Sequence, residues 1–432
     1  MRSIWTKEIQ KPCFDELQND IKTDVLIIGG GLAGILCAYE LSKAGVDYML
    51  VEQGEICSSI TQNTTAKITL NHGIIYSKLI NTYGFDKAQL YLNAQISAIE
   101  SYRKLCENID CSFEETDSYV YSLNDRCKIE SEISALQKLG YKADFCQNIA
   151  LPFDIAGAVK TEHQAQYHPL KFAYHIAKDL NIYENTKVLE LGKNCAVTNR
   201  GKIKAEKIIV TTHFPFLNKH GGYFLKMYQE RSYVIALENA ANVGGIYVDE
   251  AKKGLSFRNY NGLLLIGGSN HRTGKKSKGW QEISEFANRY YPDSKEVSRF
   301  ATQDCITLDS VPYIGQYSKS VENLYVATGF NKWGMTSAMV AAKILKSMIT
   351  GKESPFAEVF APDRTILHPR LAINITESMI NLLTPTAPRC PHLGCALKYN
   401  PAEHSWDCPC HGSRFEKDGK LINNPATDDK KF

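Results

Sequence analysis

The sequence predicts an α/β protein that ends in a small cysteine-rich unit. Near the front, residues 24–28 (DVLII) form a short apolar run typical of a buried parallel strand, and glycines and a helical stretch follow it. Residues 321–352 show the same order of strand, glycine turn and long helix near the other end. After residue 389 the chain places four cysteines and two histidines in two short boxes.

The first glycine cluster has the spacing of a dinucleotide-binding turn. Gly29, Gly31 and Gly34 satisfy G-x-G-x-x-G, and Glu52 ends a second strand, 48–51, 18 residues after Gly34. The three glycines allow a tight turn, close approach of a pyrophosphate, and close packing of helix on strand. The helix N-terminus attracts phosphates, and an acid at position 52 suits a ribose diol rather than a 2′-phosphate. We therefore predict a Rossmann-like unit that binds a dinucleotide.

Size and charge narrow the class of protein. The chain has 432 residues, enough for two or three domains, and a formal net charge of +3, which gives no electrostatic case for nucleic acid. The N-terminal residues lack the apolar core of a signal peptide, and the apolar run 24–39 is interrupted by glycines and shorter than a membrane span. We expect a cytoplasmic protein without a membrane partner. Nine of the thirteen cysteines are scattered, as expected for buried thiols in a reducing compartment.

The C-terminal boxes carry a donor set for a soft metal. Cys390-x-His392 and Cys408-x-x-His411 supply two thiolates and two imidazoles, which suit iron–sulfur or zinc and not calcium or magnesium. The double loop resembles the Rieske motif, in which two histidines replace two cysteines on one iron of a [2Fe–2S] cluster. Zinc is the alternative, but the order of residues and the extra cysteines match zinc fingers poorly.

The Rieske resemblance implies a role for each residue of the boxes. Cys390, His392, Cys408 and His411 would be the cluster ligands, and Cys395 and Cys410 would form a disulfide that ties the two loops together. Ser413 matches a serine that donates a hydrogen bond to the cluster. Respiratory members have a tyrosine two residues later, where this chain has Phe415, so we expect a lower reduction potential.

The larger part of the chain resembles the D-amino-acid-oxidase-like flavoproteins. The resemblance rests on the glycine motif and on the segments DSVPYIG (309–315), KAEKIIVTTHFP (204–215) and QYHPLKFAYHIAK (166–178), together with 321–352. It covers about 20–352 and implies a Rossmann-like FAD-binding domain, an α+β substrate domain and FAD as cofactor. The expected cofactor contacts are Gly29, Gly31, Leu32, Ala33, Gly34, Glu52, Thr64, Thr65, Ala66, Lys67, Val188, Gly329, Gly334 and Met335.

Three regions follow from the two resemblances. Residues 1–354 form the FAD-dependent oxidoreductase region, with FAD-binding segments at about 20–80, 155–215 and 305–352 and a substrate domain at about 85–150 and 216–300. Residues 355–388 form a linker with a helix near 369–383, whose Leu371, Ile375, Met379, Leu382 and Leu383 predict a packing face. Residues 389–432 form an abbreviated, β-rich Rieske module. Because few strands precede its first box, we expect its cluster loops to lean on the flavoprotein body.

The sequence contains no second complete dinucleotide motif, since residues 263–274 (LLLIGGSNHRTG) lack the third glycine and the acid. An organic substrate is therefore expected to reduce the flavin, rather than NAD(P)H. Possible substrate contacts are Arg231, Tyr233, His271, Arg272, Lys67 and His213, each equally well explained as a structural residue, so no catalytic residue is assigned. Cys305 lies at the wrong offset for flavin attachment and is expected to be a buried, inert thiol.

These observations predict an FAD-dependent oxidoreductase that oxidises a small amine or amino acid and passes electrons from FAD to the [2Fe–2S] cluster, with an unknown electron partner. The alternative is an electron-transfer protein without its own organic substrate, reduced by an external reductase. A Rieske oxygenase is disfavoured, because nothing after the boxes supplies a mononuclear iron site of two histidines and a carboxylate.

Overall fold

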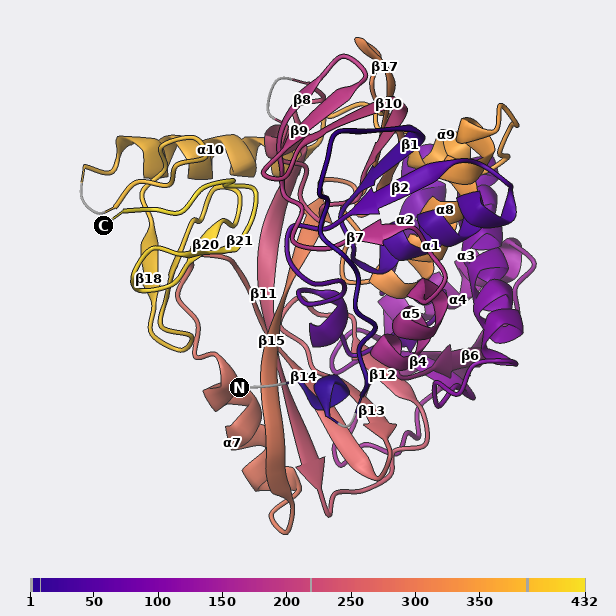
Figure 1. Ribbon diagram of the computed structural model, residues 1–432. Coiled ribbons are helices and arrows are strands. Elements are labelled where there is room, and N and C mark those ends of the chain that lie inside the picture. The colour runs from indigo at the N-terminus through magenta and orange to yellow at the C-terminus, as the bar shows by residue number, and fades with distance from the viewer. Residues whose placement is uncertain (1–2, 8, 218–219, 386–387, 432) are drawn as a thin grey trace.

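A computed structural model describes residues 3–7, 9–217, 220–385 and 388–431. Figure 1 shows a sheet covered by helices on the right, a long sheet through the middle and a small C-terminal module on the left. The predicted class, an α/β protein with a β-rich C-terminal module, is confirmed.

The first sheet is built around the strand that precedes the glycine motif. β1 (Ile21–Ile28) pairs in parallel with β10 (Lys202–Val210) and with β2 (Tyr48–Val51), and its last four residues are buried. The other strands of this eight-stranded sheet are β7 (Ile182–Tyr183), β8 (Val188–Gly192), β9 (Cys195–Thr198), β16 (Tyr313–Ser318) and β17 (Val321–Thr328). Helices α1 (Leu32–Lys43) and α8 (Gly334–Ile349) pack against each other beside it. Both strand–glycine–helix units predicted from the sequence are therefore present, and they are neighbours in space.

Close backbone packing explains why the turn between β1 and α1 requires glycine at two positions. Gly29 has a φ of +111°, and a Cβ there would lie 2.9 Å from the carbonyl oxygen of Thr211 on the neighbouring strand. A Cβ on Gly34 would overlap the carbonyl oxygen of Gly29. The first turn of α1 is thus pressed onto the end of β1, which aims the helix N-terminus at the space beyond the strand.

The second sheet has nine strands. Its order is β15 (Lys295–Thr307), β11 (Met227–Glu238), β14 (Leu263–Arg272), β13 (Ser256–Tyr260), β12 (Ile246–Asp249), β4 (Glu114–Ser122), β6 (Gly157–Gln166) and β3 (Lys67–Ile68), with β5 (Asp144–Cys146) also on β6. The sequence grouped residues 155–215 with the FAD-binding segments, whereas β6 pairs with β4 in this second sheet. The middle of β6 carries polar and charged residues (Lys160–Gln164), which suit an antiparallel strand better than the apolar run of a buried parallel one.

The remaining helices of the flavoprotein body surround these sheets. They are η1 (Ile4–Thr6), η2 (Thr61–Asn63), α2 (Tyr76–Tyr83), α3 (Phe85–Cys106), α4 (Arg126–Lys138), α5 (Pro169–Ala177), α6 (Tyr223–Lys226), α7 (Trp280–Tyr290) and α9 (Ala357–Phe360). Pro169 stands in the first turn of α5, as predicted. Within the described parts of the chain, no helix combines the length and the apolarity needed to cross a membrane.

The C-terminal module is a four-stranded antiparallel sheet of very short strands. These are β18 (Lys398–Asn400), β19 (Ser405–Asp407), β20 (Arg414–Phe415) and β21 (Leu421–Asn423). The core of the module consists largely of the four cysteines, Leu397 and Phe415. So small a core supplies little burial of its own, and the module depends on what it packs against.

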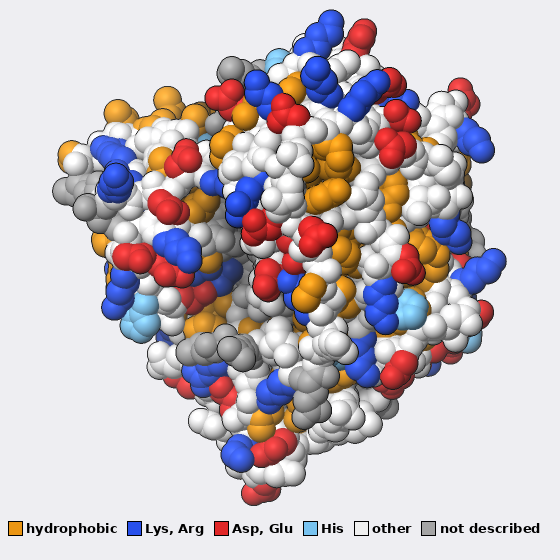
Figure 2. Space-filling model, in the orientation of Figure 1, with side chains coloured by type: hydrophobic (Ala, Val, Ile, Leu, Met, Phe, Trp, Pro, Cys, Tyr) orange, Lys and Arg blue, Asp and Glu red, His pale blue; other side chains and the backbone are white. Residues whose placement is uncertain are grey.

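Helix α10 (Pro369–Leu383) has the predicted bounds, but the predicted packing face is wrong. Met379 and Leu383 are 59% and 81% exposed, and Ile375 and Leu382 are also exposed. The buried positions are Asn374 and Asn381. Asn374 accepts a hydrogen bond of 2.8 Å from Arg272 and donates to the carbonyl of Leu225, so polar contacts hold the helix and its apolar side faces outward. Figure 2 shows hydrophobic side chains gathered at the upper left, where Figure 1 places α10.

Candidate active site and cluster site

A cavity of about 510 Å³ lies between the two sheets of the flavoprotein body. All but two of the predicted cofactor residues line it: Gly29, Gly31, Leu32, Ala33, Glu52, Thr64, Thr65, Lys67, Val188, Gly329, Gly334 and Met335. Gly34 and Ala66 are not in the cavity wall. Gly34 packs against the end of β1, and the carbonyl of Ala66 accepts a hydrogen bond from Arg258.

The end of the cavity next to α1 fits the adenosine diphosphate half of FAD. Glu52 accepts hydrogen bonds from the backbone N–H groups of Gly30 (2.7 Å) and Gly54 (3.1 Å), which fix its carboxylate at the cavity wall. A Cβ placed on Gly31 would have the hydroxyl oxygen of Thr61 as its nearest neighbour, at 3.7 Å, so a phosphate can approach the backbone closely there. The capping residue of α1 is Gly31, and the hydroxyl oxygen of Thr61 accepts a hydrogen bond from the backbone N–H of Leu32 at 3.1 Å.

The loop from Thr64 to Lys67 is held by two residues that no sequence pattern singles out. Trp5 donates its indole N–H to the carbonyl oxygen of Thr64 at 2.7 Å, and the buried Arg258 donates to the carbonyl oxygen of Thr65 at 2.8 Å. Lys67 donates to the hydroxyl oxygens of Thr65 and Ser256. Burial, with Arg258 nearby, lowers the pKa of Lys67 to about 7, so this lysine gains and loses its proton near neutral pH.

The substrate side of the cavity is formed by β11 and β15. Side chains of alternate residues on a strand point to opposite faces, so Tyr228, Glu230 and Ser232 share the face that lines the cavity. Asp304 on β15 is the register partner of Glu230 and lines the cavity as well. These residues were not singled out from the sequence; a strand assigned over 227–238 would have placed Tyr228, Glu230 and Ser232 on one face.

Three of the proposed substrate contacts, Arg231, His271 and Arg272, are not in the cavity wall. Arg231 turns away from the cavity and forms an ion pair with Glu403 of the C-terminal module. Arg272 donates to the carbonyl oxygens of Pro409 and Cys410. His271 stacks on Tyr233, which also packs against Trp280, and Tyr233 itself is among the residues that line the cavity. Lys67 and His213 do line the cavity. Cys305 is buried with its thiol donating to the carbonyl of His213, as expected for an inert thiol.

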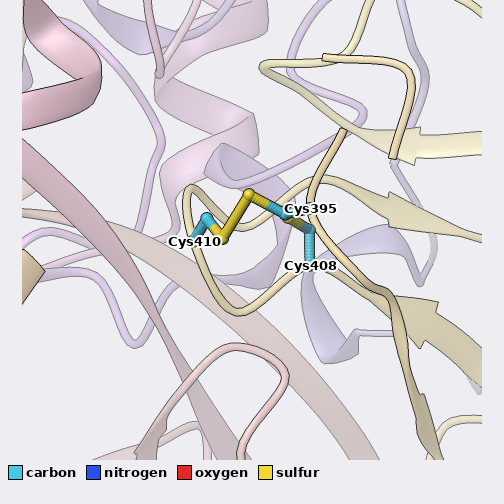
Figure 3. A group of neighbouring side chains, drawn as sticks. All are labelled: Cys395, Cys408 and Cys410. Atoms are coloured by element: carbon cyan, nitrogen blue, oxygen red, sulfur yellow. A yellow bond between two sulfur atoms is a disulfide. The ribbon is translucent and has the colours of Figure 1, made fainter. Parts of the chain in front are cut away.

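The two C-terminal boxes meet at one point. Cys390, Cys408 and His411 are almost completely buried, and the imidazole rings of His392 and His411 lie 5.0 Å apart between centroids. The sulfur atoms of Cys395, Cys408 and Cys410 lie within 4.8 Å of one another. Cys395 and Cys410 are joined by a disulfide that links the two loops (Figure 3). Because disulfide sulfurs are not thiolates, the cysteines left to bind metal are Cys390 and Cys408.

The protonation states of these groups suit a metal cluster. Burial lowers the pKa of His392 to about 4 and the pKa of His411 to about 3, so both imidazoles are neutral at pH 7. The pKa of Cys390 is lowered to about 7, first by a hydrogen bond from Cys408 and also by one from Ser413. Within the described residues, Nδ1 of His411 is buried without a hydrogen-bond partner. Neutral imidazoles, a cysteine that readily gives up its proton and an unused ring nitrogen suit a Cys₂His₂ cluster site.

Phe415 is expected to lower the potential of this cluster. It is fully buried in the module core, on the strand that follows Ser413, and offers no hydroxyl group. Replacing Phe415 with tyrosine adds a hydroxyl donor inside the core that also contains the four cysteines. One hydrogen bond of about 0.5–1.5 kcal/mol corresponds to roughly 20–60 mV for one electron, so the midpoint potential should rise by that amount. A redox titration followed by electron paramagnetic resonance measures it, with Phe85→Tyr on the exposed start of α3 as control; an unchanged or lower potential contradicts the expectation.

The module is fastened to the body by its cluster loop, on the face of the second sheet opposite the cavity. Gln229 donates to the carbonyl oxygen of His411 at 2.7 Å, and Gln303 donates to that of Gly412 at 2.8 Å. Arg231 and Arg414 both bind Glu403, with Nε of Arg231 at 3.0 Å. Figure 1 shows the module against β11, with the helices of the body beyond the sheet. The expectation that the cluster loops lean on the body therefore describes this structure.

A dinucleotide cavity between a Rossmann-like sheet and a second sheet, with a Cys₂His₂ site behind that second sheet, defines a redox protein with two cofactors. The chain belongs to the FAD dependent oxidoreductase family, whose model matches residues 24–348. The Rieske [2Fe-2S] domain model matches residues 379–431, beginning ten residues before the predicted module and within α10. The cofactors are therefore FAD and a [2Fe–2S] cluster, and the zinc alternative is set aside.

Known proteins are similar to both the flavoprotein region and the Rieske domain of this chain. A protein of Bacillus subtilis (strain 168), YhfW, which carries the name Rieske 2Fe-2S iron-sulfur protein, is 33% identical over 98% of this chain and 96% of its own length. The cytochrome b6-f complex iron-sulfur subunit of Nostoc punctiforme is 49% identical over 37 residues, 9% of this chain and 21% of that protein. L-proline dehydrogenase from P. horikoshii (TM-score 0.68) and glycine oxidase from Geobacillus kaustophilus (TM-score 0.67) share the fold at 17% identity, over 80% of this chain and 98% and 99% of theirs.

Proposed function

We propose that this FAD-dependent oxidoreductase oxidises a small organic substrate of the amine or amino acid class and delivers the electrons, one at a time, to its own Rieske cluster. Bound FAD supplies the two-electron oxidation, and the [2Fe–2S] cluster supplies one-electron transfer. The cavity residues named above would hold FAD, and Cys390, His392, Cys408 and His411 would hold the cluster.

The observation that carries this proposal is the loop after β10. His213 lies in the cavity wall, and the ring of the next residue, Phe214, lies 6.4 Å from the ring of His411. Asn424 of the module also lines the cavity and donates to the carbonyl oxygen of Phe214 at 2.7 Å. Two adjacent residues, His213 in the cavity wall and the buried Phe214 beside His411, therefore connect the cavity to the cluster site.

The two histidines differ in access, which suggests a direction for the electrons. His411 is 3% exposed and faces the body, where Phe224 also packs against its ring. His392 is half-buried, and the next residue, Leu393, is 39% exposed. We infer that electrons arrive on the His411 side and leave on the His392 side to a one-electron partner. The cytoplasmic location belongs to this proposal too, since the nine cysteines outside the module are free thiols.

Anaerobic reduction tests the proposal. Amines and amino acids are added singly to the protein under argon, while flavin absorbance and the paramagnetic signal of the reduced cluster are recorded. A substrate should bleach the flavin and then produce the cluster signal. If no organic compound reduces the flavin but an external reductase reduces both centres, the protein is an electron-transfer module instead. Bleached flavin with a silent cluster would show that the two centres are not connected.

A further inference from the structure

Two carboxylates face each other across β11 and β15 inside the cavity. Glu230 and Asp304 are register partners, and both side chains line the cavity. Glu230 is satisfied, because Lys332 lies 3.0 Å from one oxygen and the hydroxyl of Tyr228 donates to the other at 3.2 Å. In the described parts of the chain, Asp304 has neither a hydrogen bond nor a salt bridge; its nearest charges are Lys332, Glu230 and Arg231.

A second polar group beside this pair, the hydroxyl of Ser232, also lacks a hydrogen-bond partner among the described residues. Ser232, on the same face of β11 as Glu230, is 9% exposed and lines the cavity. Its hydroxyl oxygen is buried and has no hydrogen-bond partner among the described residues. A buried hydroxyl without a partner is costly, so a ligand that bonds to it is the natural explanation.

The acid pair is unfavourable without a ligand. Like charges directly opposite on neighbouring strands repel each other, and two carboxylates against the one lysine leave an excess negative charge in a buried place. Burial, aided by Glu230, raises the pKa of Asp304 to about 6 although Lys332 opposes this. Arg231, the residue of β11 that could have neutralised the pair, is turned to Glu403. What is missing at this point is a cation.

We propose that Asp304, with Glu230 and Ser232, binds the positively charged ammonium group of the substrate, so that the site selects its ligands by a cationic nitrogen rather than by a carboxylate. The inference rests on the proposed function in treating the ligand as a substrate, but the binding site itself does not depend on turnover. It narrows the amine or amino acid class to compounds that present an ammonium group to this wall of the cavity.

Calorimetric titration of the holoprotein with matched probes of opposite charge tests the site. The pairs are benzylamine with benzoate and methylammonium with acetate. Both cations should bind more tightly than their carboxylate partners, and Asp304→Asn should weaken cation binding by about 10–100-fold, as expected for one charged hydrogen bond. Glu230→Gln should weaken it less, because Lys332 shares that carboxylate. Glu285→Gln, an exposed acid on α7, is the matched control and should change nothing.

Several outcomes overturn the inference. They are tighter binding of the carboxylates, no detectable binding of either cation, and unchanged cation affinity in Asp304→Asn. Thermal unfolding separates binding from folding: Asp304→Asn should unfold at the same or a higher temperature, because it removes an uncompensated charge. Cation binding without flavin reduction would leave this inference standing while the proposed function failed, so the two failures are distinguishable.

Discussion

Replacing Cys408 with serine is expected to abolish the cluster and leave the flavin in place. Cys408 is buried beside Cys390, and its neighbours Cys395 and Cys410 are committed to the disulfide, so no other thiol of the module can replace it. A serine hydroxyl is a far harder ligand than a thiolate and does not hold iron–sulfur clusters well. Iron content should therefore fall from two atoms per chain to background, while flavin content stays at the wild-type level.

The functional consequence distinguishes the two cofactors. In the Cys408→Ser protein an organic substrate should still bleach the flavin, but reduction of an external one-electron acceptor should fall to background. Cys127→Ser is the matched control, because Cys127 is an exposed free thiol on α4. Retained iron and a wild-type cluster signal would show that Cys408 is not a ligand. Acceptor reduction at the wild-type rate without iron would show that electrons bypass the cluster.

The sequence predicted those parts of the site whose residues lie close together along the chain. The glycines of the β1–α1 turn, Glu52 and the two Cys/His boxes each act within a short stretch, so their spacing contains the geometry. The bounds of α10 were also local, since Pro369 and the apolar periodicity mark them. All of these could be read without knowing which elements are neighbours.

The predictions were wrong where the role of a residue depends on which face of its strand or helix packs against the rest of the protein. Arg231 is a plausible carboxylate clamp by residue type, but its neighbours Glu230 and Ser232 occupy the cavity face and place Arg231 on the other. The apolar residues of α10 were assigned to a packing face because helices usually bury them. Here Asn374 forms hydrogen bonds with Arg272 and with the carbonyl of Leu225 instead. The sequence around Asn374 does not predict these contacts, because both partners lie far away along the chain.

The second sheet works as a partition with a different task on each face. Odd-numbered residues of β11, such as Gln229 and Arg231, hold the Rieske module, and even-numbered ones, such as Glu230 and Ser232, form the cavity wall. A strand that serves two sites in this way needs polar residues on both faces, so β11 lacks the usual alternation of apolar and polar residues. The module can be short because the sheet supplies the support that its own few strands do not.

Replacing Glu403 with glutamine is expected to loosen this support strongly. Glu403 joins Arg231 of the body to Arg414 of the module, with Nη2 of Arg414 at 2.9 Å, and both arginines are nearly fully buried. Removing one partner of a buried ion pair costs about 3–5 kcal/mol, because it leaves charge uncompensated. The amide keeps part of the hydrogen bonding, so we expect a loss of about 3 kcal/mol in the free energy of unfolding, together with slower electron transfer from flavin to cluster.

The same network predicts how stability depends on acid. Burial opposes ionisation of Glu403, but Arg231 and Arg414 outweigh it and lower its pKa to about 2, below the ordinary 4.5. A carboxyl group with a lowered pKa in the folded state stabilises it fully above the unfolded-state pKa and loses this contribution as the pH falls toward the folded-state value. The wild-type protein should therefore lose about 3 kcal/mol between pH 5 and pH 2 through this group.

Chemical denaturation at a series of pH values checks both expectations at once. Glu403→Gln should be less stable than wild type at pH 7, and the difference between the two proteins should shrink as the pH falls from 5 to 2. Glu416→Gln, an exposed acid of the same module, should match wild type throughout. If Glu403→Gln were as stable as wild type at pH 7 and showed the same acid dependence, the Arg231–Glu403–Arg414 contact would not be what fastens the module. The cluster loop would then be held by its other contacts with the body, those of Gln229 and Gln303 with His411 and Gly412 and those of Arg272 with Pro409 and Cys410.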